Sequence, residues 1–280
     1  DGSTLMVFAN YRSEMDADNP IAIYYTRNKD GVWSQPREVV SDGTVGLYPS
    51  LTPTENGASL TWMKMNQSLS GIETCTYDEI VERIYGNMSI CQAFYDPDSD
   101  SWTTREVASD GCVVFSPAWA EDGSGEMTVW IENKANTETA TLQNPDTVCY
   151  QYVKDGKVTD SGEIPISGYD AADVTLTFNG TCYQAAIQTY DEDGAGRLCH
   201  ASYMGSGWVV AETGADETEE LYAPQYAGGY LYYLGEGRIL RKEDGRIRQI
   251  VCGSLLENVE DMTAASFWEN GVVIAWAQDQ

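Results

Sequence analysis

The chain has 280 residues, 42% of them hydrophobic, so it is long enough to bury a sizeable core. Its net charge of −28 comes from 44 acidic and 16 basic residues, which disfavours nucleic acid and anionic membranes as partners because both are negatively charged. No run of about 18 apolar residues occurs, so membrane insertion is not expected.

One stretch of sequence returns at a fixed distance. Residues 37–43 read REVVSDG and residues 105–111 read REVASDG, a shift of 68 positions. Two further markers move by the same shift: Tyr48-Pro49 corresponds to Ser116-Pro117, and Trp62 to Trp130. A period of this size indicates repeated supersecondary units, so the chain is best read unit by unit.

Each unit is expected to hold a short strand A, an apolar strand B, a tyrosine-rich strand C and a last strand D. The first unit lacks a strand A, and its strands B, C and D are expected at 5–9, 21–25 and 37–40. The four complete units, each in the order A to D, are expected at 50–52, 59–63, 90–95 and 105–108; 118–120, 127–131, 148–152 and 162–166; 174–178, 182–189, 198–203 and 208–212; 225–226, 230–234, 239–242 and 246–251. A final A and B pair is expected at 263–268 and 272–277.

Repeated four-strand units predict an all-β chain. The expected fold is a single β-propeller domain over residues 1–280, with five to six four-stranded antiparallel blades and one short helical insertion. A β-sandwich is the alternative, but it would not explain a four-strand unit repeated in register. Because the N-terminal unit offers strands B to D and the C-terminal one offers A and B, we expect residues 5–40 and 263–277 to be neighbours. We also expect Trp33, Trp62 and Trp130 to pack in the core.

The longest loop, residues 65–89, joins strands B and C of the second unit. Within it, Thr76 and Glu79 have the spacing of a capping box, and the residues after them have the apolar pattern of a short helix. This insertion either overhangs a binding site or shields the edge of a blade.

Seven cysteines are scattered along the chain without a C-x-x-C motif, so a zinc site is not expected. Two pairs are candidates for disulfides: Cys75 with Cys91, which bracket the insertion, and Cys182 with Cys199, which lie on adjacent strands of one unit. Three N-x-S/T sequons begin at Asn66, Asn87 and Asn179. Together these features predict an extracellular or cell-surface protein.

Residues 23–36, which read IYYTRNKDGVWSQP, carry a family resemblance. Thr26, Asn28, Asp30 and Trp33 follow the spacing Ser-x-Asp-x-Gly-x-x-Trp. The segment resembles the sialidase-type BNR, or Asp-box, propeller repeat, in which an Asp/Gly turn closed by an aromatic residue joins strands C and D. Looser copies of the turn follow at 98–102, 154–157, 205–208 and 242–245. The resemblance implies a propeller fold.

The antiparallel strand order places the B–C and D–A connections at one end of each blade. The B–C loops, 11–20, 65–89, 132–147 and 190–197, are long, and long loops on a rigid scaffold are often functional. The expected binding residues lie in or beside them: Arg12, Tyr77, Glu79, Arg83, Tyr85, Tyr190, Asp191 and Arg197. Tyr11, Tyr48 and Tyr222 lie near the same end.

No catalytic residue is predicted, because the one histidine, His200, has no nucleophile elbow to partner it. No cofactor is expected except calcium, which clustered carboxylates of the acidic loops could bind. The leading hypothesis is an extracellular binding module for a glycan or a protein. The alternative is a sialidase-like glycoside hydrolase, which would need paired carboxylates and an arginine cluster drawn from Arg12, Arg83 and Arg197. A purely structural surface domain is the third hypothesis.

Overall fold

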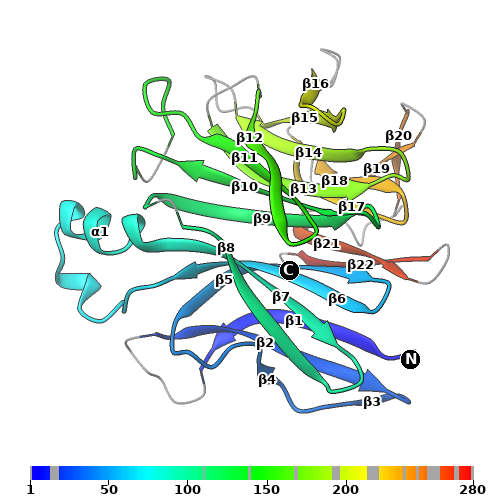
Figure 1. Cartoon of the computed structure of the whole chain (residues 1–280), viewed down its shortest axis with the longest axis horizontal. Helices are drawn as coiled ribbons and strands as arrows, with labels where there is room; N and C mark the ends of the chain where they lie inside the picture. The colour runs from blue at the N-terminus through cyan, green and yellow to red at the C-terminus, as the bar shows by residue number, and fades with distance from the viewer. Residues whose placement is uncertain are drawn as a thin grey trace. The chain divides into compact units, whose positions relative to one another are not determined.

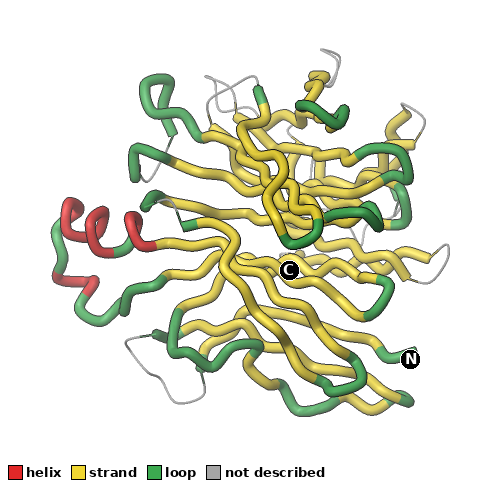
Figure 2. Tube along the Cα trace, viewed as in Figure 1, coloured by secondary structure: helices red, strands yellow, loops and turns green. Residues whose placement is uncertain are grey.

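The computed structural model is almost entirely β-structure (Figures 1 and 2). It describes residues 2–12, 19–109, 111–137, 140–166, 170–190, 196–212, 221–235, 238–243, 246–250, 259–267 and 271–278. The chain divides into two compact units, and each is described here by itself. The first unit is Asp1–Pro117 with Glu132–Glu138, and the second is Ala118–Ile131 with Thr139–Gln280. None of the helices among the described residues has the length and hydrophobicity of a membrane span.

The described strands form five four-stranded sheets and one two-stranded sheet. Blade 1 holds β1 (Thr4–Tyr11), β2 (Ile21–Lys29), β3 (Val32–Trp33) and β4 (Arg37–Glu38); blade 2 holds β5 (Val45–Thr54), β6 (Gly57–Met65), β7 (Met88–Asp96) and β8 (Ser101–Ala108); blade 3 holds β9 (Val113–Glu121), β10 (Glu126–Asn133), β11 (Thr147–Lys154) and β12 (Lys157–Ile164). Blade 4 holds β13 (Asp170–Phe178), β14 (Tyr183–Tyr190), β15 (Gly196–Tyr203) and β16 (Trp208–Glu212); blade 5 holds β17 (Leu221–Ala227), β18 (Tyr230–Gly235), β19 (Arg238–Glu243) and β20 (Arg246–Gln249); β21 (Val259–Phe267) pairs with β22 (Gly271–Gln278).

This arrangement confirms the predicted fold class, a β-propeller of four-stranded antiparallel blades with one short helical insertion. Every predicted strand is present among the described residues, although the ends differ by a few positions. Strand D of blade 1 is split into β3 and β4, which both pair with β2, and Pro36 between them has no N–H to donate. Two expectations involve both units: that the chain is a single domain, and that residues 5–40 and 263–277 are neighbours. Both stay predictions.

A β-bulge recurs in the first strand of several blades. The pairing register shifts between Leu47 and Ser50 in β5, between Ala171 and Asp173 in β13, between Tyr222 and Gln225 in β17, and between Val259 and Asp261 in β21. Three residues that each precede a proline have left-handed backbone angles: Tyr48 (φ 54°), Ser116 (φ 46°) and Ala223 (φ 50°). The repeated Tyr48-Pro49 and Ser116-Pro117 markers are therefore backbone features, since a bulge bends its strand and redirects a side chain.

Blades 1 and 2 bury apolar side chains against each other within the first unit. Ile23 and Tyr25 of β2 belong to one core cluster with Leu60 and Trp62 of β6 and Ala93 of β7. This packing supplies the burial that a single sheet cannot provide for both of its faces.

The tryptophan predictions were confirmed for Trp62 and Trp130, which are 4% and 5% exposed, and wrong for Trp33, which is 45% exposed. Trp102, which follows Trp33 by 69 residues at the matching point of the next repeat, packs edge-on against Tyr25 of the preceding blade, with ring centroids 5.5 Å apart. Trp33 instead lies in the two-residue strand β3 at the tip of a hairpin, where its neighbour Val32 is exposed as well.

Asp100 ties blade 2 to blade 1 at the opposite end of the sheets from the long loops. Its Oδ1 accepts a hydrogen bond of 2.6 Å from Tyr95 and its Oδ2 forms an ion pair with Arg37, while its carbonyl oxygen accepts 3.2 Å from the Tyr25 hydroxyl. Burial raises the pKa of the Asp100 carboxyl, but the hydrogen bonds from Tyr95 and Arg37 outweigh it and leave this pKa below its ordinary value. The ionised carboxylate is therefore the form that holds the two blades.

Asp100→Ala should lower the free energy of unfolding by about 1–3 kcal/mol, because the Tyr95 and Arg37 partners lose their acceptor. Asp100→Asn should cost less, since asparagine keeps an acceptor and tolerates the left-handed backbone of this position (φ 50°). The lowered pKa means that the carboxylate's contribution is complete above about pH 4 and is lost as pH falls through the folded-state pKa. Urea melts between pH 3 and 7 measure both effects. Asp98→Ala, in the same turn, is the control, and equal stability of the Asp98 and Asp100 alanine variants would contradict the assignment.

Neither predicted disulfide forms, since all six described cysteines are thiols. Cys199 pairs with Ile187, and Cys182 lies five residues before Ile187, about 17 Å away at 3.4 Å per residue, far beyond the reach of a disulfide. Cys91 lies opposite Trp62 in the core between blades 1 and 2, three residues inside the Met65–Met88 pair that begins the insertion. Cys75 lies within the insertion and donates to the carbonyl oxygen of Gly71.

Denatured without reductant, the protein should therefore take up at least six alkylating groups, one for each described thiol, as counted by intact mass. In the folded protein Cys91 should react slowest, because burial raises the pKa of its thiol to about 11 and shields it from the reagent. Uptake of five groups or fewer by the denatured chain, which has seven cysteines, would restore a disulfide model.

Candidate functional site

The connections between strands gather at one end of blades 1 and 2, called here the loop end of the first unit. It comprises residues 12 and 19–20 of the β1–β2 connection, the β4–β5 connection, the β6–β7 insertion and residues 109 and 111–112 of the β8–β9 connection. The β10–β11 connection of the first unit is hydrogen-bonded to the β8–β9 connection: Asn136 accepts 2.9 Å from the Val113 amide and donates 3.3 Å to the Gly111 carbonyl. A β-carbon at Gly86 of the insertion would lie 3.6 Å from the same carbonyl oxygen. The loop end is thus a connected surface.

Arg12 fastens two of these connections together. Its Nε lies 3.3 Å from Glu38 Oε1, its Nη2 donates 2.9 Å to the Thr44 carbonyl, and its Nη1 donates to the Asn19 carbonyl. Arg12 is half-buried, and its guanidinium forms these hydrogen bonds and this ion pair within the protein. The geometry gives it a positioning role for the β1–β2 loop.

The insertion contains the 3-10 turns Ile72–Thr74 and Tyr85–Asn87 around the helix α1 (Tyr77–Arg83). The predicted capping box is present: the Thr76 side chain accepts from the Glu79 amide, and the Thr76 amide donates 2.7 Å to Glu79 Oε2. Asn66 and Asn87 close the base through a hydrogen bond of 2.9 Å between their backbones. In Figure 1, α1 projects beyond the ends of β6 and β7.

Two of the predicted binding residues hold the insertion in shape. Arg83 Nη2 donates 2.6 Å to the Ser68 carbonyl and 2.7 Å to the Ser70 carbonyl. Hydrogen bonds from Thr76 lower the pKa of Glu79, which keeps the carboxylate ionised as a helix cap. Tyr77, on the same helix, is 49% exposed and presents its ring to solvent, whereas Tyr85 is half-buried.

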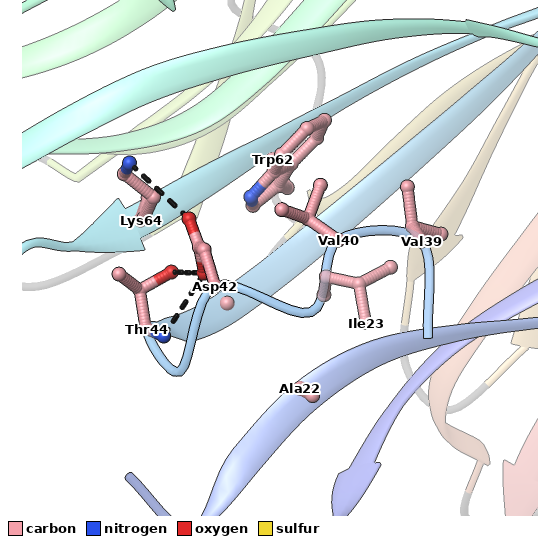
Figure 3. Close-up of a pocket in the computed structure, with 9 residues that line it drawn as sticks. Ala22, Ile23, Val39, Val40, Asp42, Thr44, Trp62 and Lys64 are labelled. Carbon is pink, nitrogen blue, oxygen red and sulfur yellow. Dashed lines mark hydrogen bonds and ion pairs between the residues drawn. The ribbon is translucent and has the colours of Figure 1, made fainter. Parts of the chain in front are cut away.

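A shallow hollow with a cavity volume of about 20 Å³ opens between blades 1 and 2 at the loop end (Figure 3). Its lining is Ala22, Ile23, Val39, Val40, Asp42, Thr44, Gly46, Trp62 and Lys64. A space of this size holds about one water-sized group, so the hollow can receive no more than a single hydroxyl of a ligand that lies on the surface around it.

Polar groups gather at one side of this hollow. Asp42 Oδ1 accepts 3.0 Å from the Thr44 amide and 2.5 Å from the Thr44 hydroxyl, and its Oδ2 lies 3.7 Å from Lys64 Nζ. Burial raises the pKa of Asp42, but the Thr44 hydrogen bonds and the Lys64 charge outweigh it and leave the pKa below its ordinary value. The hollow therefore offers an ionised carboxylate, an ammonium and a hydroxyl beside the apolar side chains of Trp62 and Val40.

Sequence analysis missed the hollow. The sequence predicts Trp62 as a core residue only, and it shows Asp42 as part of the repeated REVVSDG stretch. The available signal was Lys64, a charged residue at the end of the apolar strand that reads ASLTWM. Two exposed tyrosines adjoin the loop end: Tyr11 at the end of β1 is 66% exposed, and Tyr48 in the β5 bulge is 61% exposed.

The remaining predicted residues belong to the second unit. Tyr190 pairs with Gly196 at the base of the β14–β15 loop, and its hydroxyl accepts 2.7 Å from Gln188 Nε2. Arg197 is exposed on β15, opposite Thr189, and Asp191 lies outside the described residues. That these residues share one site with those of the first unit stays a prediction.

His200 sits between blades 4 and 5, where its Nε2 accepts 3.2 Å from Lys242 Nζ. Burial, with the Lys242 charge, lowers its pKa to about 4, so the imidazole is neutral at physiological pH. Within the described ranges no three histidine, cysteine or carboxylate side chains are arranged to hold a metal, and calcium binding stays a prediction.

No family model and no curated protein matches this sequence. Solved structures do match over its length. AofleA from Arthrobotrys oligospora is 12% identical with a TM-score of 0.53, over 99% of this chain and 83% of that protein. Trypanosoma rangeli sialidase is 10% identical with a TM-score of 0.60, over 100% of this chain and 51% of that one, so the chain spans about half of the sialidase. At these identities the matches show the fold alone: the chain has a sialidase-type β-propeller fold.

Arg83→Ala should loosen the insertion, because two carbonyl groups lose their shared donor. Chymotrypsin should then cut at Tyr77 or Tyr85 faster than in the parent protein, while the sheet signal in circular dichroism stays unchanged. Glu82→Ala, on the exposed face of the same helix, is the control. Equal cleavage rates for the Arg83 and Glu82 variants would contradict the anchoring role.

Proposed function

We propose that this chain is an extracellular binding module that recognises a glycan through the loop end of its first unit. The observation that carries the proposal is the exposure of three tyrosines, Tyr11, Tyr48 and Tyr77, at or near an end that also holds the Asp42–Lys64 hollow. Exposed large aromatic side chains in a surface rich in polar groups are typical of binding sites.

The chemistry of this surface suits a sugar. A pyranose or furanose ring presents C–H groups to an aromatic face, while its hydroxyls exchange hydrogen bonds with charged and polar side chains. Tyrosine rings supply the first interaction, and Asp42, Thr44 and Lys64 supply the second. The Trypanosoma rangeli sialidase whose fold this chain shares has been solved with sialic acid bound, which supports a glycan as the class of ligand.

Binding is favoured over hydrolysis by the carboxylates of the hollow. Glycosidases use two carboxyl groups on opposite sides of the scissile bond, about 5–9.5 Å apart, one of them protonated. Asp42 is the one carboxylate among the nine lining residues, and its lowered pKa keeps it ionised. A glycoside hydrolase is therefore the second candidate. The proposal places the chain outside the cell or on its surface, where glycans are displayed.

The test is a binding measurement on a panel of immobilised oligosaccharides, with the parent protein and a variant in which residues 68–85 are replaced by Asn-Gly. The backbone bond between Asn66 and Asn87 closes the base of the insertion, so the variant should keep its fold and melting temperature. Its affinity for any retained glycan should fall at least tenfold. Unchanged affinity in the folded variant, or no glycan retained by the parent, would contradict the proposal, and turnover of glycosides by the parent would favour the hydrolase.

A further inference from the structure

We infer, on the basis of the proposed function, that Tyr48 is the ring on which the sugar stacks and that the ligand is an uncharged glycan. The sequence places Tyr48 near the loop end, but the repeat does not explain its ring, because its repeat counterparts carry different side chains. The inference rests on three observations: the left-handed backbone of Tyr48, the position of Tyr48 two residues after Gly46 of the hollow, and the intramolecular hydrogen bonds and ion pairs of the cations at the loop end.

Tyr48 has the left-handed backbone of the recurring bulge (φ 54°), which is unfavourable for a bulky side chain. Ser116 and Ala223 occupy the same conformation before their own prolines, so the bulge itself belongs to the fold. What differs is the side chain that it carries. At position 48 this is a large aromatic ring, and 61% of it is exposed, so packing of the blade does not account for it.

Tyr48 lies close to the hollow along the chain. Gly46, which lines the hollow, precedes Tyr48 by two residues on β5, about 7 Å along the strand. Gly46 pairs with Lys64, whose ammonium faces Asp42 across the hollow, as Figure 3 shows. A sugar ring stacked on Tyr48 can therefore extend a hydroxyl toward Asp42 and Lys64.

The intramolecular partners of the cations at this end favour an uncharged ligand. Sialic and uronic acids are usually gripped by arginines that offer two parallel N–H donors. Arg12 already donates to the Asn19 and Thr44 carbonyls and pairs with Glu38, and Arg83 already donates to the Ser68 and Ser70 carbonyls. Lys64 is paired with Asp42, Lys134 lies 4.0 Å from Glu132, and the chain carries a net charge of −28, so a carboxylated sugar would meet repulsion without an arginine clamp among the described residues of this end.

The experiment is calorimetric titration with neutral oligosaccharides and with the same oligosaccharides capped by sialic acid. Tyr48→Ala should weaken binding of the neutral ligands at least tenfold, while Tyr48→Phe should stay within about threefold because the ring face is kept. Trp33→Ala, which removes an exposed aromatic ring at the opposite end of blade 1, should leave affinity unchanged. Preference of the parent protein for the capped ligands, or equal binding by Tyr48→Ala, would overturn the inference while leaving a glycan-binding module intact. Absence of any glycan binding by the parent would instead overturn the proposed function and this inference with it.

Glycine variants separate a binding role from a structural one. Tyr48→Gly should relieve the left-handed backbone and raise the melting temperature by about 2–4 °C, yet lose binding as the alanine variant does. Ser116→Gly, at the equivalent left-handed position before Pro117 in blade 3, should raise the melting temperature similarly and keep full affinity. A lowered melting temperature with unchanged affinity for Tyr48→Gly would show that Tyr48 serves the fold and would overturn the inference.

Discussion

The packing of each sheet against its neighbour is the constraint on which the rest of this structure depends. A four-stranded sheet with apolar side chains on both faces cannot bury them alone, so each blade needs the next one. Within the first unit, Ile23 and Tyr25 of blade 1 meet Leu60 and Trp62 of blade 2 in one cluster. Within the second unit, Trp208 of blade 4 packs on Tyr150 of blade 3, as Trp102 of blade 2 packs on Tyr25 of blade 1.

This constraint fixes the strands and leaves the connections at the loop end free to vary. Antiparallel order sends the connections between the second and third strands of a blade, and those between successive blades, to the same end. Arg12, Arg83 and Asn136 illustrate the consequence, because each uses its polar groups to fasten one connection to another or to itself. The hollow and the exposed tyrosines can then be presented on a surface that is held without disulfides among the described cysteines.

Much of this fold could be predicted from the sequence because its signals are local. Alternating apolar residues marked the strands, Asp30-Gly31 and Asp155-Gly156 marked tight hairpins and do have positive φ angles, and Thr76 with Glu79 marked the start of α1. The prediction of a Cys182–Cys199 disulfide was wrong because a disulfide between neighbouring strands requires cysteines that lie opposite each other. Cys199 lies opposite Ile187, five residues from Cys182. The hollow was missed because it depends on how Trp62 and Lys64 meet Asp42 and Val40 from another connection, and one strand's pattern does not contain that contact.

The central claim is that a glycan binds at the loop end of the first unit. Hydrogen–deuterium exchange with and without a saturating neutral oligosaccharide tests it most directly, because it reports where backbone amides become protected. The account predicts added protection in residues 42–48 and 64–66 and in the insertion, with none in the β2–β3 and β7–β8 turns at the opposite end. Protection confined to those turns, or to the second unit alone, would contradict it.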